Sequence, residues 1–273
     1  MGGTPRRTGD YTIERRLGEV ERLHLQGEVL AAETGEMLDC IGVGKGWACL
    51  DLGCGPRGIT RELSRRVGPE GRVTGLDFDE AFVEIARAEA AANTNFLAGD
   101  AYATGLPDAD FDLVHVRFLA STAGQPERLV AEALRLARPG GVVAFQEADF
   151  LTLNCYPPHP AWKALRDALA SCFPQTGEDP TAQRIFRLLR SGGLREVEYR
   201  PVLVGVRSGD PWQDYLPATI ESLRGAVIAR GLIPEAMFDR QLAECRRHLA
   251  EVETVFTSYT VVQTWGRVAS PGN

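Results

Sequence analysis

The fold of this chain is decided by the stretch LDLGCGPRG at residues 50–58, an apolar run that closes in a glycine-rich turn. A turn of this kind at the start of a helix brings a ligand close to free backbone N–H groups. The helix dipole there favours an anionic or hydroxyl-rich partner. Gly53, Gly55 and Gly58 satisfy the pattern G-x-G-x-x-G, which several cofactor classes share. The residues around the turn must therefore distinguish between these classes.

Strands and helices alternate on both sides of the turn. The sequence predicts strands over 47–52, 72–77, 94–98, 111–116 and 141–147, with helices near 57–67, 79–92 and 125–138. Strands that alternate with helices form a parallel sheet covered on both faces. Right-handed crossovers bring the carboxyl ends of the strands to one edge, where ligands bind. We therefore expect an α/β fold with a doubly wound, mostly parallel sheet.

The remaining segments add helices and strands to this centre. Apolar positions recur every three to four residues between Tyr11 and Leu38, which predicts one or two amphipathic helices ahead of the main domain. A proline-rich loop at 150–160 follows the alternating part. Later segments are predicted as helices over 161–172, 181–189 and 211–252, and as strands over 194–206 and 255–268.

Composition narrows the class of protein. The 273 residues, 44% apolar and 25% charged, are typical of a globular domain with a full core. A net charge of −7 gives no electrostatic footprint for a nucleic acid. The six cysteines form no C-x-x-C pair and the four histidines form no closely spaced pair, so no metal site is expected. Without a signal peptide or an apolar run of about 18 residues, the chain is predicted to be cytoplasmic, with no membrane partner.

Two acidic residues near the turn favour one cofactor class over another. Asp51 precedes the first glycine by two residues. A carboxylate there would repel a pyrophosphate but can receive the ammonium group of an amino acid moiety. Asp77 ends a strand 22 residues after Gly55, and at that edge it can accept hydrogen bonds from ribose hydroxyls. Its alternative role is to cap the next helix, for which Asp79 is better placed.

Two further motifs follow in order. Asp100 and Ala101 end the third predicted strand, where the carboxylate can accept from an adenine amino group and the Ala101 amide can donate to the ring. The fourth strand, FDLVHV at 111–116, is followed by the turn RPGGVV at 138–143, which leads into the fifth. His115, inside the fourth strand, is expected to be a core residue with satisfied hydrogen bonds.

With these motifs in place, the chain resembles the class I S-adenosylmethionine-dependent methyltransferases over about residues 46–150. In that family the first motif corresponds to 50–58, the ribose acid to Asp77, the adenine motif to Asp100 and Ala101, and the turn before the fifth strand to 138–143. The strands at 194–206 and 255–268 are similar to the family's terminal antiparallel pair. The resemblance implies a Rossmann-like sheet of seven strands, S-adenosylmethionine as cofactor and S-adenosylhomocysteine as product. Pro56 stands where the family often has glycine.

The resemblance also implies further residues that contact the cofactor. The backbone at Gly53 and Gly55 would approach the ligand directly. Arg117, after the fourth strand, would pair with the cofactor carboxylate or else form a surface salt bridge. Phe78 would pack on the adenine ring or in the core. The segment 1–45 is expected to be a helical lid, in which Tyr11 contacts the sulfonium by a cation–π interaction or packs on its own helix.

The catalytic residues are unknown at this stage. Methyl transfer depends mainly on alignment of the reacting atoms, and a general base is needed only for some acceptors. The two candidates are Glu147 and His159. Glu147, at the end of the fifth strand, would take a proton or bind an acceptor ammonium, or else solvate a loop. His159 would be a base near neutral pH, or an exposed loop residue.

The sequence therefore predicts an enzyme that methylates a small molecule, such as a natural product or secondary metabolite, on nitrogen, oxygen or carbon. A methyltransferase domain over 46–273 would carry a helical cap at about 207–254, and this cap would enclose an apolar acceptor pocket. A protein or nucleic acid methyltransferase is the main alternative. A dinucleotide-dependent oxidoreductase is disfavoured by Asp51 and by the motif at 100–101, and a non-catalytic cofactor-binding protein stays open. A monomer or a homodimer is expected.

Overall fold

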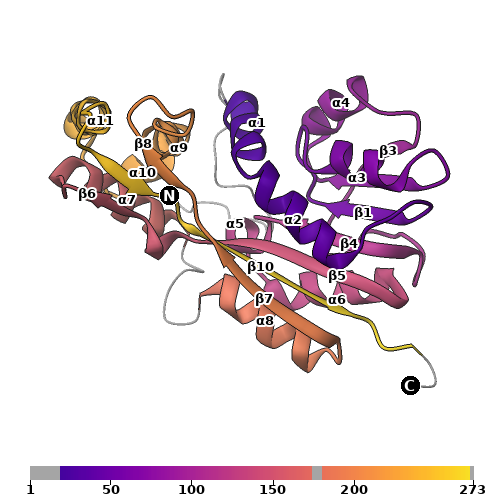
Figure 1. Cartoon of the computed structure of the whole chain (residues 1–273). Coiled ribbons are helices and arrows are strands. Elements are labelled where there is room, and N and C mark those ends of the chain that lie inside the picture. Colours follow the sequence, from indigo (N-terminus) through magenta and orange to yellow (C-terminus); the bar gives the residue numbers. More distant parts are fainter. Residues whose placement is uncertain (1–18, 174–179, 271–273) are drawn as a thin grey trace, which may run out of the picture.

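A seven-stranded sheet forms the centre of the molecule in the computed structural model, which describes residues 19–173 and 180–270 (Figure 1). Its strands run in the order β3 (Thr94–Ala98), β2 (Arg72–Asp77), β1 (Ala48–Leu52), β4 (Phe111–Arg117), β5 (Ala137–Asp149), β10 (Thr260–Arg267) and β7 (Arg195–Val202). Within this sheet, β10 pairs antiparallel with β5 and with β7, and the other neighbouring strands are parallel. The chain moves outward from β1 to β3 and then returns to β4, so the order of the strands reverses between β1 and β4. Ligands bind at such a switch point, and the predicted doubly wound, mostly parallel sheet is confirmed.

Helices cover both faces of this sheet because its central strands are apolar on both sides. On one face, α2 (Ala31–Ile41) and α3 (Thr60–Val67) pack against β1, β2 and Trp265. On the same side, α4 (Glu80–Ala88) packs against Phe96 of β3. The other face is covered by α5 (Ala120–Ala123), α6 (Pro126–Leu136) and α8 (Thr181–Ser191).

A second, smaller sheet was not expected from the sequence. It contains three short antiparallel strands, β6 (Asn154–Tyr156), β9 (Val255–Thr257) and β8 (Gly205–Arg207). Each long predicted strand, 194–206 and 255–268, therefore divides between the two sheets. The division is fixed at Ser258, whose backbone N–H donates to the Val204 carbonyl at 2.8 Å while its hydroxyl accepts from the Val204 N–H at 2.9 Å.

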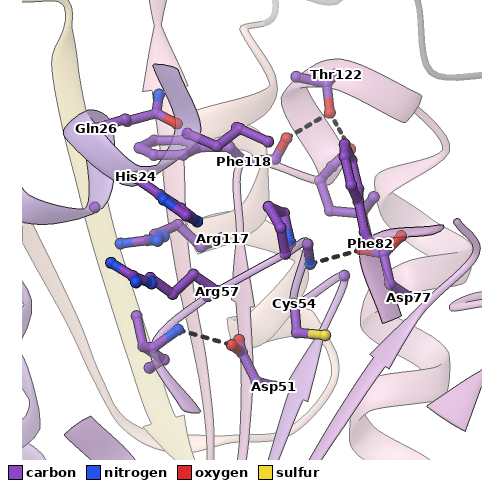
Figure 2. Close-up of a pocket in the computed structure, with 18 of the residues that line it drawn as sticks. His24, Gln26, Asp51, Cys54, Arg57, Asp77, Phe82, Arg117, Phe118 and Thr122 are labelled. Atoms are coloured by element: carbon purple, nitrogen blue, oxygen red, sulfur yellow. Dashed lines mark hydrogen bonds between the residues drawn. The ribbon is translucent and has the colours of Figure 1, made fainter. Parts of the chain in front are cut away.

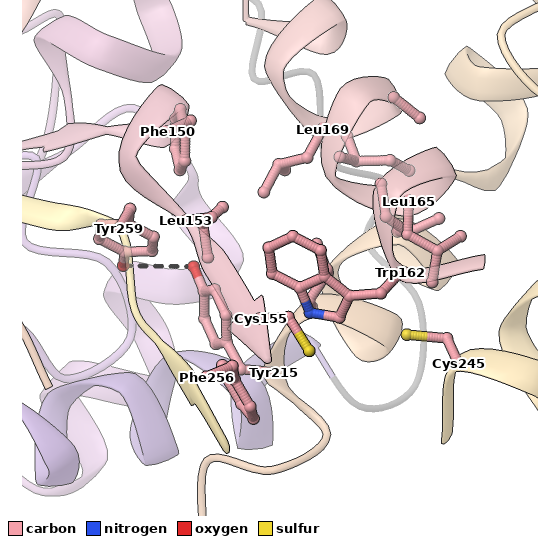
Figure 3. Close-up of a cluster of buried hydrophobic side chains, with 14 of the residues drawn as sticks. Phe150, Leu153, Cys155, Trp162, Leu165, Leu169, Tyr215, Cys245, Phe256 and Tyr259 are labelled. Carbon is pink, nitrogen blue, oxygen red and sulfur yellow. Dashed lines mark hydrogen bonds between the residues drawn. The ribbon is translucent and has the colours of Figure 1, made fainter. Parts of the chain in front are cut away.

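The small sheet belongs to a cap lobe (Figure 1). This lobe has an apolar core of its own, part of which is drawn in Figure 3. Four helices complete this lobe, namely α7 (Pro160–Cys172), α9 (Tyr215–Ser222), α10 (Arg224–Ala229) and α11 (Glu235–Leu249). Its core includes Phe150, Trp162 and Phe173 in addition to residues from the expected cap. The cap lobe is thus built from the segment before α8 as well as from the expected insertion at 207–254.

The N-terminal segment has two different surroundings. Helix α1 (Glu19–Val29) lies between the cap lobe and the glycine turn, whereas α2 packs on one face of the large sheet (Figure 1). Met37 and Leu38 of α2 are completely buried, so this helix is part of the domain core. Tyr11 and the other residues before Glu19 lie outside the described residues. Within the described ranges, no helix is long and apolar enough to cross a membrane.

Candidate active site

A cavity of about 1290 Å³ opens at the carboxyl edge of β1 and β4 and extends to the cap lobe. Its wall includes Gly55 and Asp77 at one end and Phe150, Phe173 and Tyr215 at the other. A pocket for one small ligand usually measures about 300–1,000 Å³. This cavity is large enough for two ligands in contact with each other, and Figure 2 shows part of its wall.

The glycine turn gives one end of the cavity its shape. Gly53, Gly55 and Gly58 have φ angles of 77°, 59° and 44°, in the left-handed region that favours glycine. A Cβ at Gly58 would lie 2.3 Å from a carboxylate oxygen of Asp51, which no side chain can accommodate. At Gly55, nothing lies within 4 Å of the position that a Cβ would take. A ligand can therefore approach the backbone closely at Gly55.

Asp51 is held by partners inside the protein. Its Oδ1 lies 2.8 Å from His115 Nδ1, and its Oδ2 accepts from the Ile59 N–H at 3.0 Å. Burial raises the pKa of Asp51, but the hydrogen bonds from His115 and the Ile59 amide, together with the charge of Arg117, outweigh burial and hold the pKa below its ordinary value. His115 Nε2 lies 2.9 Å from Gln146 Nε2, which donates to it, so the imidazole proton belongs on Nδ1. Asp51 thus stays ionised on the cavity wall, and His115 is a satisfied core residue as expected.

Asp77 fastens the glycine turn to the end of β2. Its Oδ2 accepts from the Gly55 N–H at 2.7 Å, and its Oδ1 accepts from the Asp79 N–H at 2.9 Å. Burial raises the pKa of the Asp77 carboxyl above its ordinary value, against the effect of these two amides. The N-cap of α4 is Asp79, which accepts from the Ala81 N–H at 3.0 Å. Asp77 is therefore left at the cavity wall, as the ribose role requires.

The remaining predicted cofactor residues that the structure describes also line this cavity. Phe78 is 74% exposed, so its ring is not part of the core. The Asp100 carboxylate accepts from the Tyr102 N–H at 2.8 Å. Eight of the nine predicted residues line this cavity, namely Asp51, Gly53, Gly55, Asp77, Phe78, Asp100, Ala101 and Arg117. The ninth, Tyr11, lies outside the described residues.

The side chains of Arg117 and His24 lie in the same part of the cavity (Figure 2). Burial lowers the pKa of the Arg117 guanidinium, while the nearby charge of Asp51 acts in the opposite direction. Arg117 makes no salt bridge with any residue that the structure describes. His24 of α1 has a buried Nε2 with no hydrogen-bond partner in the described ranges. Both side chains reach into the same part of the cavity (Figure 2), and the sequence had not singled out His24.

A hydrogen-bonded group of three residues joins α1 to the cap lobe. Gln26 Nε2 donates to the hydroxyls of Tyr259 at 2.7 Å and Tyr215 at 3.2 Å. The Tyr215 hydroxyl donates to Tyr259 at 3.2 Å, a contact shown in Figure 3. Burial raises the pKa of Tyr259 well above its ordinary value, so its phenol is neutral. All three residues line the cavity.

Aromatic rings form the rest of the wall at the cap. The Phe150 and Phe173 rings stack with centroids 5.0 Å apart, and Tyr259 lies edge-on to Phe118 at 5.8 Å and to Phe150 at 5.2 Å. Six carboxylate residues line the cavity within the described ranges, namely Glu28, Asp51, Glu62, Asp77, Asp79 and Asp100. None of these comes from the cap lobe. As far as the structure describes it, the cap end of the cavity is therefore mainly aromatic and carries no carboxylate.

Glu147 and His159, the two catalytic candidates, are placed elsewhere. The Glu147 carboxylate is completely buried and accepts from the backbone N–H groups of Ala120 at 3.0 Å and Ser121 at 2.9 Å. His159 caps α7 through its Nδ1, and its ring stacks on His248 with centroids 4.6 Å apart. Neither side chain lines the cavity. The geometry gives no support for direct contact of either residue with an acceptor.

Comparisons with known proteins agree with this arrangement. A family model described as a methyltransferase domain matches residues 50–145. The chain is 33% identical over 172 residues to a demethylmenaquinone methyltransferase of Lactococcus lactis, a match that covers 57% of this chain and 68% of that protein. A demethylmenaquinone methyltransferase of Staphylococcus aureus is 38% identical over 120 residues, covering 42% of this chain and 49% of the relative. The match therefore spans only about half of the Staphylococcus protein.

Solved structures share the fold at low sequence identity. The YcgJ protein of Bacillus subtilis has a TM-score of 0.56 at 15% identity and covers 86% of this chain and 98% of its own. A phosphoethanolamine N-methyltransferase of Haemonchus contortus, in complex with S-adenosylmethionine, has a TM-score of 0.50 at 14% identity. The match covers 83% of this chain and 49% of the Haemonchus chain. The glycine turn, the acids around it, the strand order and these matches lead to one conclusion: the chain is a member of the class I S-adenosylmethionine-dependent methyltransferases.

Proposed function

We propose that this enzyme transfers the methyl group of S-adenosylmethionine to a flat, apolar small molecule whose nucleophile is a hydroxyl or the ring that carries it. One observation carries the proposal: a single cavity joins the glycine turn to an aromatic wall to which the described part of the cap lobe contributes no carboxylate. The cofactor would occupy the end near Asp77, and the acceptor would lie against Phe150 and Tyr215.

The cofactor end fits S-adenosylmethionine on three observations. The backbone at Gly55 is open to a ligand, and Asp77 stands beside it. Arg117 and the unpartnered Nε2 of His24 provide donors for a carboxylate. Ionised Asp51 provides a charge for an ammonium group. When bound there, the cofactor supplies an electrophilic methyl group on its sulfonium sulfur.

The acceptor end favours a neutral or anionic arene. Aromatic walls bind flat rings by stacking and edge-to-face contacts. An ammonium acceptor would lose its hydration without gaining a carboxylate from the described residues of the cap lobe, which is costly for a buried charge. A phenolic oxygen would instead find the hydroxyl of Tyr259, which accepts two hydrogen bonds and keeps its own O–H to donate. The names of the two relatives point the same way, since demethylmenaquinone is a quinone.

The described residues of the cavity wall orient the acceptor relative to the cofactor, and the paired, neutral Tyr259 does not act as a general base. Tyr259 is held neutral and already accepts two hydrogen bonds, so it can orient an acceptor but does not serve as a base. Phe118, Phe150 and Tyr259 fix the plane of an arene and exclude water from the reacting end. Orientation of this kind supplies a large share of the rate enhancement in bimolecular transfers.

The test is a panel of matched acceptors incubated with the enzyme and S-adenosylmethionine, with release of S-adenosylhomocysteine as the readout. Naphthols and hydroquinones are compared with naphthylamines and phenylenediamines of the same size and shape. We expect turnover with hydroxylated members and none with the amines. Turnover confined to the amines would overturn the proposed acceptor class while leaving the assignment of the cofactor intact.

A further inference from the structure

Glu147 organises a turn that forms one wall of the cavity. The turn begins at Arg117, at the end of β4, and passes through Phe118 and Leu119 into α5. The residues of this segment that line the cavity are Arg117, Phe118, Leu119, Thr122 and Ala123. Glu147 lies behind the turn on β5, and its two carboxylate oxygens accept from the first two amides of α5.

The turn contains a residue in a costly backbone conformation. Phe118 has a φ of 56°, in the left-handed region that a bulky side chain rarely adopts. Strain of this size persists only where the surroundings determine the conformation, and it is common at ligand sites. Two neighbouring residues of β5 restrain this turn. The Phe118 N–H donates to the Gln146 carbonyl at 2.8 Å, and the Glu147 carboxylate accepts from the two amides at the start of α5.

The strained conformation places side chains on both ends of the cavity. Phe118 packs edge-on against Tyr259 at the acceptor end. Leu119 lies against the glycine turn, since its Cδ2 is 2.9 Å from the position of a Cβ built on Gly53. A change in the turn therefore moves the wall beside the cofactor and the wall beside the acceptor together.

We propose that Glu147 is a positioning residue for methyl transfer: its ionised carboxylate fixes the turn at 117–121, and loss of that charge releases the turn and weakens cofactor binding. A carboxylate accepts from two N–H groups at once, whereas a carboxylic acid or an amide presents one donor to one of them. The geometry thus requires the ionised form for both hydrogen bonds.

The ionisation of Glu147 occurs near neutral pH. Burial raises its pKa to about 7, against the effect of Ser121 and of the amides of Leu119 and Ala120. The titratable group that faces it from the segment after β3 is the phenol of Tyr102, and its neighbour on β10 is Val262. Tyr102 has a pKa of about 12 and stays neutral.

The effects of pH on stability and on ligand affinity then have opposite signs. Because the folded state holds this proton more tightly than the unfolded state does, ionisation of Glu147 lowers stability as the pH rises from about 4.5 to about 7. The same ionisation completes the two hydrogen bonds and tightens cofactor binding. A residue with only a structural role would not give opposite trends over one pH range.

The experiment compares the wild type with Glu147→Gln by calorimetric titration of S-adenosylhomocysteine between pH 6 and 8.5, with hydrogen exchange of the segment 117–124 in the free protein. We expect about tenfold weaker binding by the variant at pH 8, a much smaller difference at pH 6, and faster exchange at the amides of Ala120 and Ser121. The free proteins report on the turn whether or not an acceptor is known.

The matched control is Glu132→Gln. Glu132 is also buried and accepts from a backbone N–H, that of Thr104 at 2.9 Å, but it lies outside the cavity wall and its pKa is about 2. This control should bind S-adenosylhomocysteine with the pH dependence of the wild type. The proposal is wrong if Glu147→Gln also binds S-adenosylhomocysteine with the affinity and pH dependence of the wild type and its amides at 117–124 exchange hydrogen at the wild-type rate. If the variant fails to fold, the wild type decides: its amides at 120 and 121 must exchange faster at pH 6 than at pH 8 after correction for the intrinsic rate.

Discussion

At the scale of single residues, Asp77 is the predicted cofactor residue whose position is best defined by its hydrogen bonds. It accepts from Gly55 and Asp79 and remains on the cavity wall. We expect Asp77→Ala to weaken binding of S-adenosylhomocysteine at least about tenfold, because charge-assisted hydrogen bonds to ribose hydroxyls are lost. Calorimetry measures this directly. The control is Asp110→Ala, which removes a carboxylate that pairs with Arg72 ahead of β4 and should leave the affinity for S-adenosylhomocysteine unchanged. An unchanged dissociation constant for Asp77→Ala would remove this residue from the site.

His115 supports Asp51 from within the sheet. Replacement by leucine removes the hydrogen bond to a carboxylate that is only 2% exposed and leaves Gln146 without an acceptor. We expect His115→Leu to lower the free energy of unfolding by ~3–5 kcal/mol, as for other buried charges that lose a partner. Urea denaturation of the apoprotein gives the value. A loss below about 1 kcal/mol would mean that Asp51 does not depend on this histidine.

The sequence predicted those residues whose roles depend on local geometry. Gly53, Gly55 and Asp77 follow from a strand that enters a turn, and the register between β1 and β2 brings them together. The sequence did not single out His24 or Gln26, because their contacts arise only when α1 packs against α9 and the end of the sheet. The partners of Glu147 lie 26 and 27 residues away in the chain, so no spacing rule could reveal them.

At the scale of elements, α1 and α2 have different tasks although one helical pattern covers both. Met37 of α2 is completely buried in the domain core, whereas Gln26 of α1 lines the cavity. We expect Met37→Ala to cost about 2–5 kcal/mol of unfolding free energy through the cavity it leaves. Gln26→Leu should cost no more than about 1–2 kcal/mol, because the two tyrosine hydroxyls still bond to each other.

Urea midpoints for the two variants test this difference. An equal loss of stability would show that α1 is as much a part of the core as α2. A larger loss for Gln26→Leu would contradict the assignment of its side chain to the cavity wall.

The strands of the cap lobe mark the limit of periodicity as a guide. Apolar alternation continues from β9 into β10 and from β7 into β8, and nothing in it marks the change of sheet at Ser258. Strands β6, β8 and β9 are three residues long, too short to give a pattern of their own. Their pairing depends on contacts between distant segments of the chain.

At the scale of the whole molecule, the sheet domain and the cap lobe meet at one cavity. The sheet domain supplies the glycine turn and its acids, the cap lobe supplies the aromatic wall, and α1 lies between them. We expect the two ends of this cavity to bind different molecules. A substitution at one end should therefore affect one ligand and spare the other.

The most direct test is a double comparison with Asp77→Ala and Phe150→Leu. For each variant, the affinity for S-adenosylhomocysteine and the KM for the hydroxylated arene that the wild type turns over best are measured side by side. We expect Asp77→Ala to lose cofactor affinity at least about tenfold, and Phe150→Leu to raise the acceptor KM several-fold while it keeps cofactor affinity. If Phe150→Leu weakens S-adenosylhomocysteine as strongly as Asp77→Ala does and leaves the acceptor KM unchanged, the division of the cavity into two ends is contradicted.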